Sequence, residues 1–157
     1  GGVVVPKRRS LIEMTDSERD AFLASGRTLN LASLGPNGRP HLVAMWYCLL
    51  DGTIWCWTYA KSQKALNLRR DPRVTGLIEQ GDRYEELRGV TIYANAAIEE
   101  SPSQVALVGR TLFERYQSGT STVSIESFLG SAPKRIAFAL AVEEFVSWDH
   151  RKLEGRY

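Results

Sequence analysis

An apolar stretch of nine residues, Leu42 to Leu50, runs directly into Asp51-Gly52 and a second apolar run, and few folds accommodate such a segment. Asp-Gly between two apolar runs is a strong signal for a two-residue hairpin turn, in which Leu50 pairs with Thr53. The first strand does not alternate between apolar and polar residues, as a strand with one wet face would. Both faces of this hairpin must therefore be covered.

The hairpin register divides its side chains between two faces. A barrel interior would cover one face, and the other needs a helix, a partner subunit or a bound planar ligand; core packing with a dimer contact is the simplest alternative. The register also places Cys48 and Cys56 on opposite faces, which disfavours a disulfide. One face is expected to carry Ala44, Trp46, Cys48, Trp55, Trp57 and Tyr59, and the other Val43, Met45, Tyr47, Ile54, Cys56 and Thr58.

The rest of the chain alternates turn signals with short strands and a few helices. Thr15 to Glu18 forms a capping box that opens a helix, and Asp71-Pro72 ends another that begins near Ser62. A mainly β fold follows, a six-stranded antiparallel barrel in one domain over residues 1–157, with 1–14 as a flexible arm. The strands are expected at 28–34, 40–50, 53–59, 74–80, 88–100 and 135–148, with further helices at 101–119 and 125–129.

Composition excludes several classes of protein. Hydrophobic residues make up 43% and charged residues 24%, as in ordinary soluble domains, and no apolar stretch approaches the roughly 20 residues of a membrane span. A formal net charge of +2 speaks against generic nucleic-acid binding. Two cysteines without a Cys-x-x-Cys pair, and two histidines, form no recognisable zinc set. The first nine residues hold only three consecutive valines before a basic cluster, so they do not have the apolar core expected of a signal peptide. A cytoplasmic protein is expected.

Positive charge is concentrated between Lys61 and Arg73, where five basic residues and one acid give +4. A helix starting at Ser62 would offer free N–H groups to an anion, with Lys61 and Lys64 beside them and Asn67 on the same face. Leu66 and Leu68 would turn toward the barrel. The alternative is a solvated surface helix, but this helix leaves a strand whose neighbour already needs a covering ligand.

Four segments of the chain match a known pattern. Gly38 to His41 before the second strand and Lys64 to Arg73 resemble the split-barrel flavin- and deazaflavin-dependent reductases related to pyridoxamine 5′-phosphate oxidase. Tyr84 to Val90 and Ser147 to Leu153 are similar to the actinobacterial branch that uses the deazaflavin coenzyme F420. The resemblance extends from Asp16 to Leu153.

The resemblance implies an FMN-binding-like split barrel and a homodimer with two cofactor sites at the subunit interface. Lys64 and Asn67 would hold the cofactor's phosphate region with help from Thr58, while relatives carry an arginine where Ser62 stands. Lys61, Arg69 and Arg70 would attract the acidic tail of F420. The expected cofactor-binding residues are Val43, Ala44, Met45, Trp46, Trp57, Thr58, Lys61, Lys64 and Asn67.

The implied activity is hydride transfer from reduced F420 to an unsaturated small-molecule acceptor, with His41, Tyr84 and Trp148 contacting the substrate. No catalytic residue is expected, because the cofactor supplies the chemistry and the sequence lacks a nucleophile motif or carboxylate pair. Three alternatives remain: an FMN-dependent oxidase or reductase, a non-catalytic flavin- or haem-related binding protein, and a structural dimer without a ligand.

Overall fold

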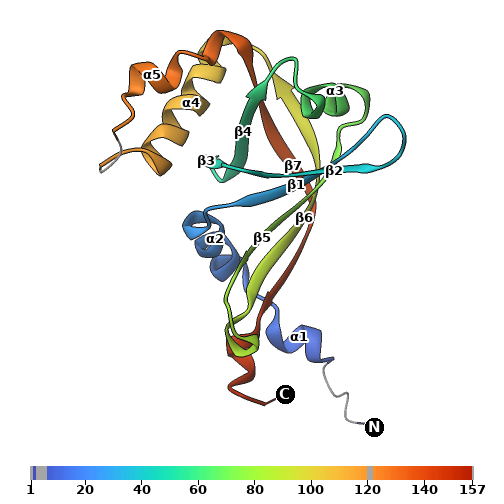
Figure 1. Cartoon of the computed structure of the whole chain (residues 1–157). Helices are drawn as coiled ribbons and strands as arrows, with labels where there is room; N and C mark the ends of the chain where they lie inside the picture. Colours follow the sequence, from blue (N-terminus) through green and yellow to red (C-terminus); the bar gives the residue numbers. More distant parts are fainter. Residues whose placement is uncertain (1, 3–6, 120–121, 157) are drawn as a thin grey trace.

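The computed structural model describes residues 2, 7–119 and 122–156 and shows one curled antiparallel sheet with helices around it (Figure 1). The strand order is β2-β1-β5-β6-β7-β4-β3, and every pairing is antiparallel. This confirms the mainly β split-barrel class. The strands are β1 (Leu29–Leu34), β2 (Pro40–Met45), β3 (Cys48–Leu50), β4 (Thr53–Tyr59), β5 (Arg73–Gln80), β6 (Arg88–Glu99) and β7 (Arg135–Asp149).

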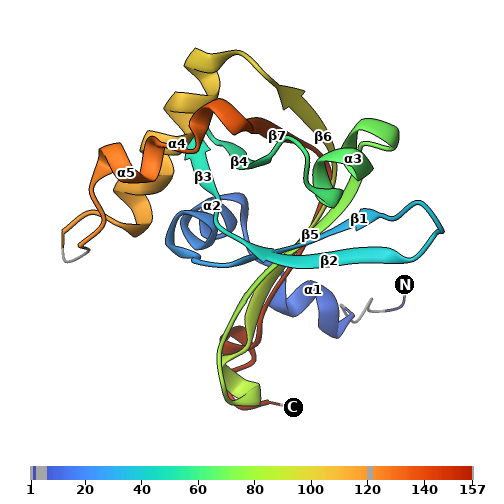
Figure 2. The same cartoon turned by 45° about the horizontal axis from the view of Figure 1, so that its top comes forward.

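The sheet has seven strands where six were expected, because the segment 40–50 is not one strand. It breaks at Trp46-Tyr47 into β2, which pairs with β1, and β3, which pairs with β4 (Figure 2). The chain must bend there, since β1 and β4 are separated by three strands in the sheet order and one straight strand cannot pair with both. The apolar pattern continues through the bend, which is why the sequence did not indicate it.

The predicted hairpin register is confirmed. Leu50 pairs with Thr53 and Cys48 with Trp55, while both cysteines are free and buried. The inward face joins the barrel core, and the outward face of β3 and β4 is covered by the long helix α4 (Pro102–Tyr116). The buried members of this second cluster are Cys48, Trp57, Val105, Val108, Leu112 and Ala137.

The helices begin where the capping residues predict. Thr15 and Glu18 form the capping box of α2 (Asp16–Ser25), and the Ser62 hydroxyl accepts from the Ala65 N–H at the start of α3 (Gln63–Arg70). Leu68 is buried as expected, but Leu66 is exposed. Residues two apart on a helix point in nearly opposite directions, so the two leucines cannot share one face.

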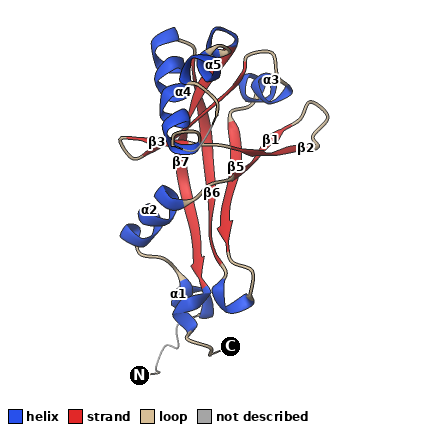
Figure 3. Cartoon of the chain, turned by 60° about the vertical axis from the view of Figure 1, so that its left-hand side comes forward, coloured by secondary structure: helices blue, strands red, loops and turns tan. Residues whose placement is uncertain are grey.

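Beyond the barrel, β5, β6 and β7 continue as a long ribbon toward the end of the molecule that carries both termini (Figure 3). Helix α1 (Arg8–Ile12) lies there, and Met14 is buried, with its N–H donating to Ser147 Oγ at 3.0 Å. The expected flexible arm 1–14 thus includes a docked part, while residues 1 and 3–6 lie outside the described residues. The remaining elements are α5 (Ile125–Leu129), η1 (Tyr84–Glu86), η2 (Ala132–Lys134) and η3 (His150–Leu153).

No helix within the described residues combines the length and apolar character needed to cross a membrane.

Candidate functional site

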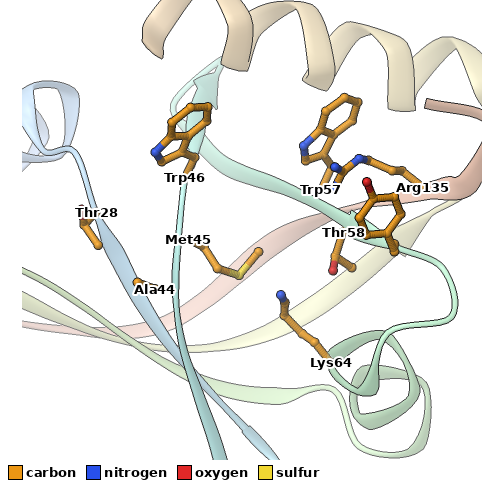
Figure 4. A pocket seen from close by; sticks show the side chains of 9 residues that line it. Thr28, Ala44, Met45, Trp46, Trp57, Thr58, Lys64 and Arg135 are labelled. Carbon is orange, nitrogen blue, oxygen red and sulfur yellow. The ribbon is translucent and has the colours of Figure 1, made fainter. Parts of the chain in front are cut away.

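A cavity of about 440 Å³ lies between β2 and β4, two strands that are not hydrogen-bonded to each other in the sheet (Figure 4). It opens where the barrel is split, so its walls come from elements distant in sequence. The side chains that line it come from β2, β4, α3, the start of β7 and the residue before β1. They are Thr28, Ala44, Met45, Trp46, Trp57, Thr58, Tyr59, Lys64 and Arg135.

One part of the wall is apolar and aromatic. Trp46 follows directly after β2 and is 40% exposed, which is unusual for a large indole, and Met45 lies beside it. Trp57 on β4 is nearly buried by α4 and presents its remaining surface to the cavity. Aromatic and thioether surfaces of this kind receive a flat ring.

The other part of the wall carries two cations. Lys64 projects from the first turn of α3 toward Met45 and Thr58, and Arg135 enters from the first residue of β7 (Figure 4). The Arg135 guanidinium lies 4.4 Å from the centre of the Trp57 ring and 4.0 Å from that of Tyr59, and its Nε donates to Ser131 Oγ at 2.8 Å.

Lys64 and Arg135 lie in a setting that does not compensate their positive charge. Burial lowers the pKa of Lys64, as does the neighbouring Arg135, and burial also lowers the pKa of Arg135. None of the residues that line the cavity is acidic, and within the described part of the chain neither cation forms an ion pair with a carboxylate. An anion in the cavity would relieve this uncompensated charge.

Two hydroxyls lie next to the cations. Thr58 Oγ1 is 3.2 Å from Ser62 Oγ, which also accepts from the Ala65 N–H at 3.1 Å as the cap of α3. Thr58 itself is buried in the cavity wall. The start of α3, Thr58 and Lys64 therefore form one polar corner that suits a phosphate group.

Most of the cofactor-binding residues expected from the sequence meet in this cavity: Ala44, Met45, Trp46, Trp57, Thr58 and Lys64. The other three do not line it. Val43 is half-buried and pairs with Leu31, on the side of β2 that faces the barrel core, and Lys61 is exposed at the surface.

Asn67 is fully buried beneath α3 rather than open to the cavity. Its Nδ2 donates to Ser33 Oγ at 3.1 Å, and its Oδ1 accepts from Gln63 Nε2 at 2.8 Å and from Arg70 at 3.2 Å. The amide thus joins α3 to β1, and it contributes by holding the helix in place.

The remaining basic residues of the segment 61–73 are engaged elsewhere. Arg69 forms an ion pair with Glu100, and Arg73 pairs with Asp71 at 2.7 Å. Arg70 donates to the Leu34 carbonyl. Of these five basic side chains, all within the described residues, Lys64 alone enters the cavity.

Sequence reasoning missed Arg135, Tyr59 and Thr28. Arg135 was expected to begin the last strand, but nothing local connects it to the basic segment. It reaches the cavity because β7 pairs with β4 in the register that sets Arg135 opposite Tyr59. Thr28 reaches the cavity as the residue before β1, next to β2.

The three expected substrate contacts are not brought together within one chain. His41 lies on β2 opposite Ser33, and its Nδ1 is buried without a hydrogen-bond partner among the described residues. Tyr84 and Trp148 lie on the ribbon at the end opposite α3 (Figure 1). There the Tyr84 ring meets His150 edge-on at 4.6 Å, and Trp148 packs against Gly89.

Metal ligands do not gather in the described residues, where no group of three His, Cys, Asp or Glu side chains could hold an ion.

A family model described as pyridoxamine 5′-phosphate oxidase matches residues 15–149. The structure is similar to that of the conserved hypothetical protein Rv2991 from Mycobacterium tuberculosis, with 45% identity, a TM-score of 0.86 and coverage of 95% of this chain and 93% of that one.

Two more distant structures share the fold. An F420 reductase is 20% identical with a TM-score of 0.63, over 80% of this chain and 94% of its own. HutZ, a heme storage protein from Vibrio cholerae, is 20% identical with a TM-score of 0.66, over 84% and 94%. None of the curated proteins compared with the chain matches it. The family match, which spans residues 15–149, shows that this chain belongs to the pyridoxamine 5′-phosphate oxidase family.

Proposed function

We propose that this protein is an oxidoreductase that binds coenzyme F420 in the cavity between β2 and β4 and passes a hydride from it to an unsaturated small molecule. One observation carries this proposal: two cations that have no acidic partner among the described residues face the same cavity as two tryptophans. A ligand that satisfies both must combine a flat ring with an anionic group.

The residues present fit such a cofactor. The cavity volume of about 440 Å³ lies within the usual range for small-molecule sites. The ring would rest against Met45 and Trp46, and the phosphate would accept hydrogen bonds from Lys64, Arg135 and Thr58. When bound, a deazaflavin supplies hydride-transfer chemistry, so the chain needs no nucleophile.

The protein's own contribution is position and exclusion of water. Trp46 and Trp57 give the ring fixed surfaces, and the polar corner at the start of α3 fixes the opposite end of the cofactor. An acceptor bound against the exposed face of the ring would then lie at reacting distance. The proton that completes the reduction would come from solvent.

F420 is preferred over FMN because the segments 84–90 and 147–153 resemble the deazaflavin branch and because an F420 reductase shares the fold. The same polar corner would also hold the phosphate of FMN. Because a heme storage protein is among the structural neighbours, haem is the alternative ligand that a binding experiment has to test.

The proposal includes a homodimer. Leu42 on the edge strand β2 is 68% exposed, and Ala44 and Trp46 on the same face are also exposed, which leaves an apolar face for a second copy. Tyr84 and Trp148 are remote from their own chain's cavity, so they would contact a substrate from the partner subunit. The free thiols of Cys48 and Cys56 suit a reducing cytoplasm.

Titration of the purified protein with F420, FMN, FAD and haem, followed by fluorescence and absorbance, tests this function. We expect F420 to bind most tightly, and its reduced form to be oxidised when an enone, quinone or tetrapyrrole acceptor is added. Tighter binding of FMN with turnover would assign the flavin alternative. Haem binding without F420 binding would identify a binding protein, and absence of any binding would refute the site.

A further inference from the structure

We propose that Tyr116, at the end of α4, is a positioning residue that sets the tryptophan wall of the cavity to receive a flat ring, although it does not line the cavity itself. This inference rests on the proposed function, because it concerns the ring-binding half of the same site. It is carried by the contacts that Tyr116 makes at the break between β2 and β3.

The Tyr116 hydroxyl binds backbone groups that the strand break leaves without ladder partners. Tyr47 N–H donates to the hydroxyl at 3.2 Å, and the Tyr47 carbonyl oxygen lies 3.1 Å from it. The hydroxyl also donates to the Arg27 carbonyl oxygen, at 2.8 Å. One side chain from α4 therefore accepts from the backbone N–H at the bend and ties the bend to the segment before β1.

The Tyr116 ring fixes the neighbouring side chain. It stacks on Trp46 with ring centres 4.4 Å apart and an interplanar angle of 1°, while the Arg27 guanidinium lies 4.4 Å from the Tyr116 ring centre. Trp46 is thus held through its ring and through the backbone of the next residue. A partly exposed indole would otherwise occupy several rotamers, and ordering it in advance lowers the cost of binding a ligand.

The neighbour of Tyr116 at the bend, Tyr47, is itself held by several contacts. The side chain of Tyr47 is fully buried, its hydroxyl donates to the Leu23 carbonyl at 2.5 Å, and the Arg115 guanidinium lies 4.7 Å from its ring centre. Burial raises the pKa of Tyr47 to about 12, so the hydroxyl stays a donor. The bend is therefore anchored to α2 and α4 together.

A second aromatic contact links the two tryptophans. Phe128 on α5 lies 6.4 Å from Trp46 and 5.3 Å from Trp57 between ring centres, at interplanar angles of 25° and 24°. The pair α4 and α5 therefore holds both indoles from outside the cavity. Lys64 and Arg135, in contrast, are held by α3 and β7.

Because separate elements hold the tryptophans and the cations, changing Tyr116 should weaken binding of a ring and leave binding of an anion unchanged. Tyr116→Leu removes the stack and the hydroxyl, and Tyr116→Phe keeps the stack and removes the hydroxyl alone. We measure binding of two probes: a deazaflavin with its ribityl chain but no phosphate, and inorganic phosphate competing against F420. Tyr93→Leu and Tyr93→Phe make the same changes at an exposed tyrosine of β6 that is outside the cavity.

We expect Tyr116→Leu to weaken binding of the phosphate-free deazaflavin by about tenfold relative to wild type, the size of a lost aromatic pair with its hydrogen bond. Tyr116→Phe, which keeps the aromatic pair, should weaken it by only about two- to threefold. Inorganic phosphate should bind every variant within about twofold of wild type, since Lys64 and Arg135 keep their supports. The tryptophan bands in the near-ultraviolet circular dichroism spectrum of the ligand-free protein report the order of Trp46. These bands should change for Tyr116→Leu and stay unchanged for both Tyr93 variants.

Equal weakening of both probes would show a general structural role and overturn the inference, as would unchanged binding of the deazaflavin to Tyr116→Leu. If Tyr116→Leu does not fold, the same comparison is made with Tyr116→Phe, for which a two- to threefold selective loss is expected. Failure of the wild-type protein to bind F420 or the deazaflavin refutes the proposed function instead.

Discussion

Lys64 is the side chain on which the anionic half of the site depends most directly. Lys64 is half-buried and carries its charge into a cavity whose lining includes no carboxylate from the described residues. It lies in the first turn of α3, directly after the Ser62 cap. Burial lowers the pKa of its ammonium group, so a bound anion would raise that pKa again.

Replacing Lys64 with alanine should weaken F420 binding by about 1.5–3 kcal/mol, the loss of one charge-assisted hydrogen bond. Lys61→Ala is the matched control, because Lys61 is exposed and does not line the cavity. Isothermal titration calorimetry gives both affinities. An unchanged affinity for Lys64→Ala, or an equal loss for Lys61→Ala, would contradict the assignment.

Gly109 sets how closely α4 approaches the cavity. A Cβ atom at this position would lie 2.5 Å from the Trp57 ring and 2.8 Å from Leu129. Gly109→Ala should therefore lower the free energy of unfolding by about 1–3 kcal/mol, even though alanine favours helix by about 1 kcal/mol. Urea unfolding measures the change, with exposed Arg110→Ala as the control. Stabilisation by Gly109→Ala would show that Trp57 moves aside without cost.

At the scale of elements, α2 is joined to the far end of the chain by one carboxylate. Glu18 closes the capping box by accepting from Thr15 N–H at 2.8 Å, and it pairs with Lys152 Nζ at 2.6 Å. The hydrogen bond from Lys152, followed by those from Thr15, lowers the pKa of Glu18 from 4.5 to about 2. This links the start of α2 to η3.

The lowered pKa of Glu18 predicts a pH dependence. A carboxylate with a depressed folded-state pKa stabilises the fold above its ordinary pKa, and this contribution is lost as pH falls from about 4.5 toward 2. Glu18→Gln should therefore flatten the acid side of the stability curve in that window. Urea midpoints measured across it, with Glu126→Gln in the first turn of α5 as the control, test this. Parallel curves for Glu18→Gln and wild type would disprove the link.

At the scale of the whole molecule, β2 lies at the edge of the sheet with an uncovered apolar face. If β2 forms the interface of the proposed dimer, Leu42→Glu should make the protein monomeric at micromolar concentration, because burying an unpaired charge there costs free energy. Leu107→Glu introduces the same charge at an exposed leucine of α4 and should leave the proposed dimer intact. Light scattering that finds wild type monomeric, or both variants dimeric, would reject β2 as the interface.

The helix starts and the hairpin could be read from the sequence because short-range physics fixes them. The Ser62 cap, the Thr15 to Glu18 box and the register across Asp51-Gly52 each involve residues a few positions apart. The bend at Trp46-Tyr47 could not be read in this way. It depends on which strands β2 and β3 pair with, and on Tyr116 arriving from α4 to satisfy Tyr47.

The candidate site shows the same contrast between local and long-range contacts. Hairpin register and charge indicated the tryptophans and Lys64, which lie on one hairpin and on the helix that follows it, and the family resemblance added Thr58. Arg135 could not be assigned to the site from the sequence, because it comes close to Lys64 only through the pairing of β7 with β4, across some 70 residues of chain. Asn67 shows the opposite case: helical spacing places it near Lys64, but its amide donates to Ser33 and the residue is buried beneath α3.

The sequence by itself determined the local elements, the covered hairpin and the family pattern, because turn chemistry, caps and hydrophobic periodicity act over a few residues. The tertiary structure decided which cations share the cavity, where the strand breaks and which apolar face stays open. Those outcomes depend on contacts between segments far apart in the chain, and their register is set when the sheet curls and the helices pack against it.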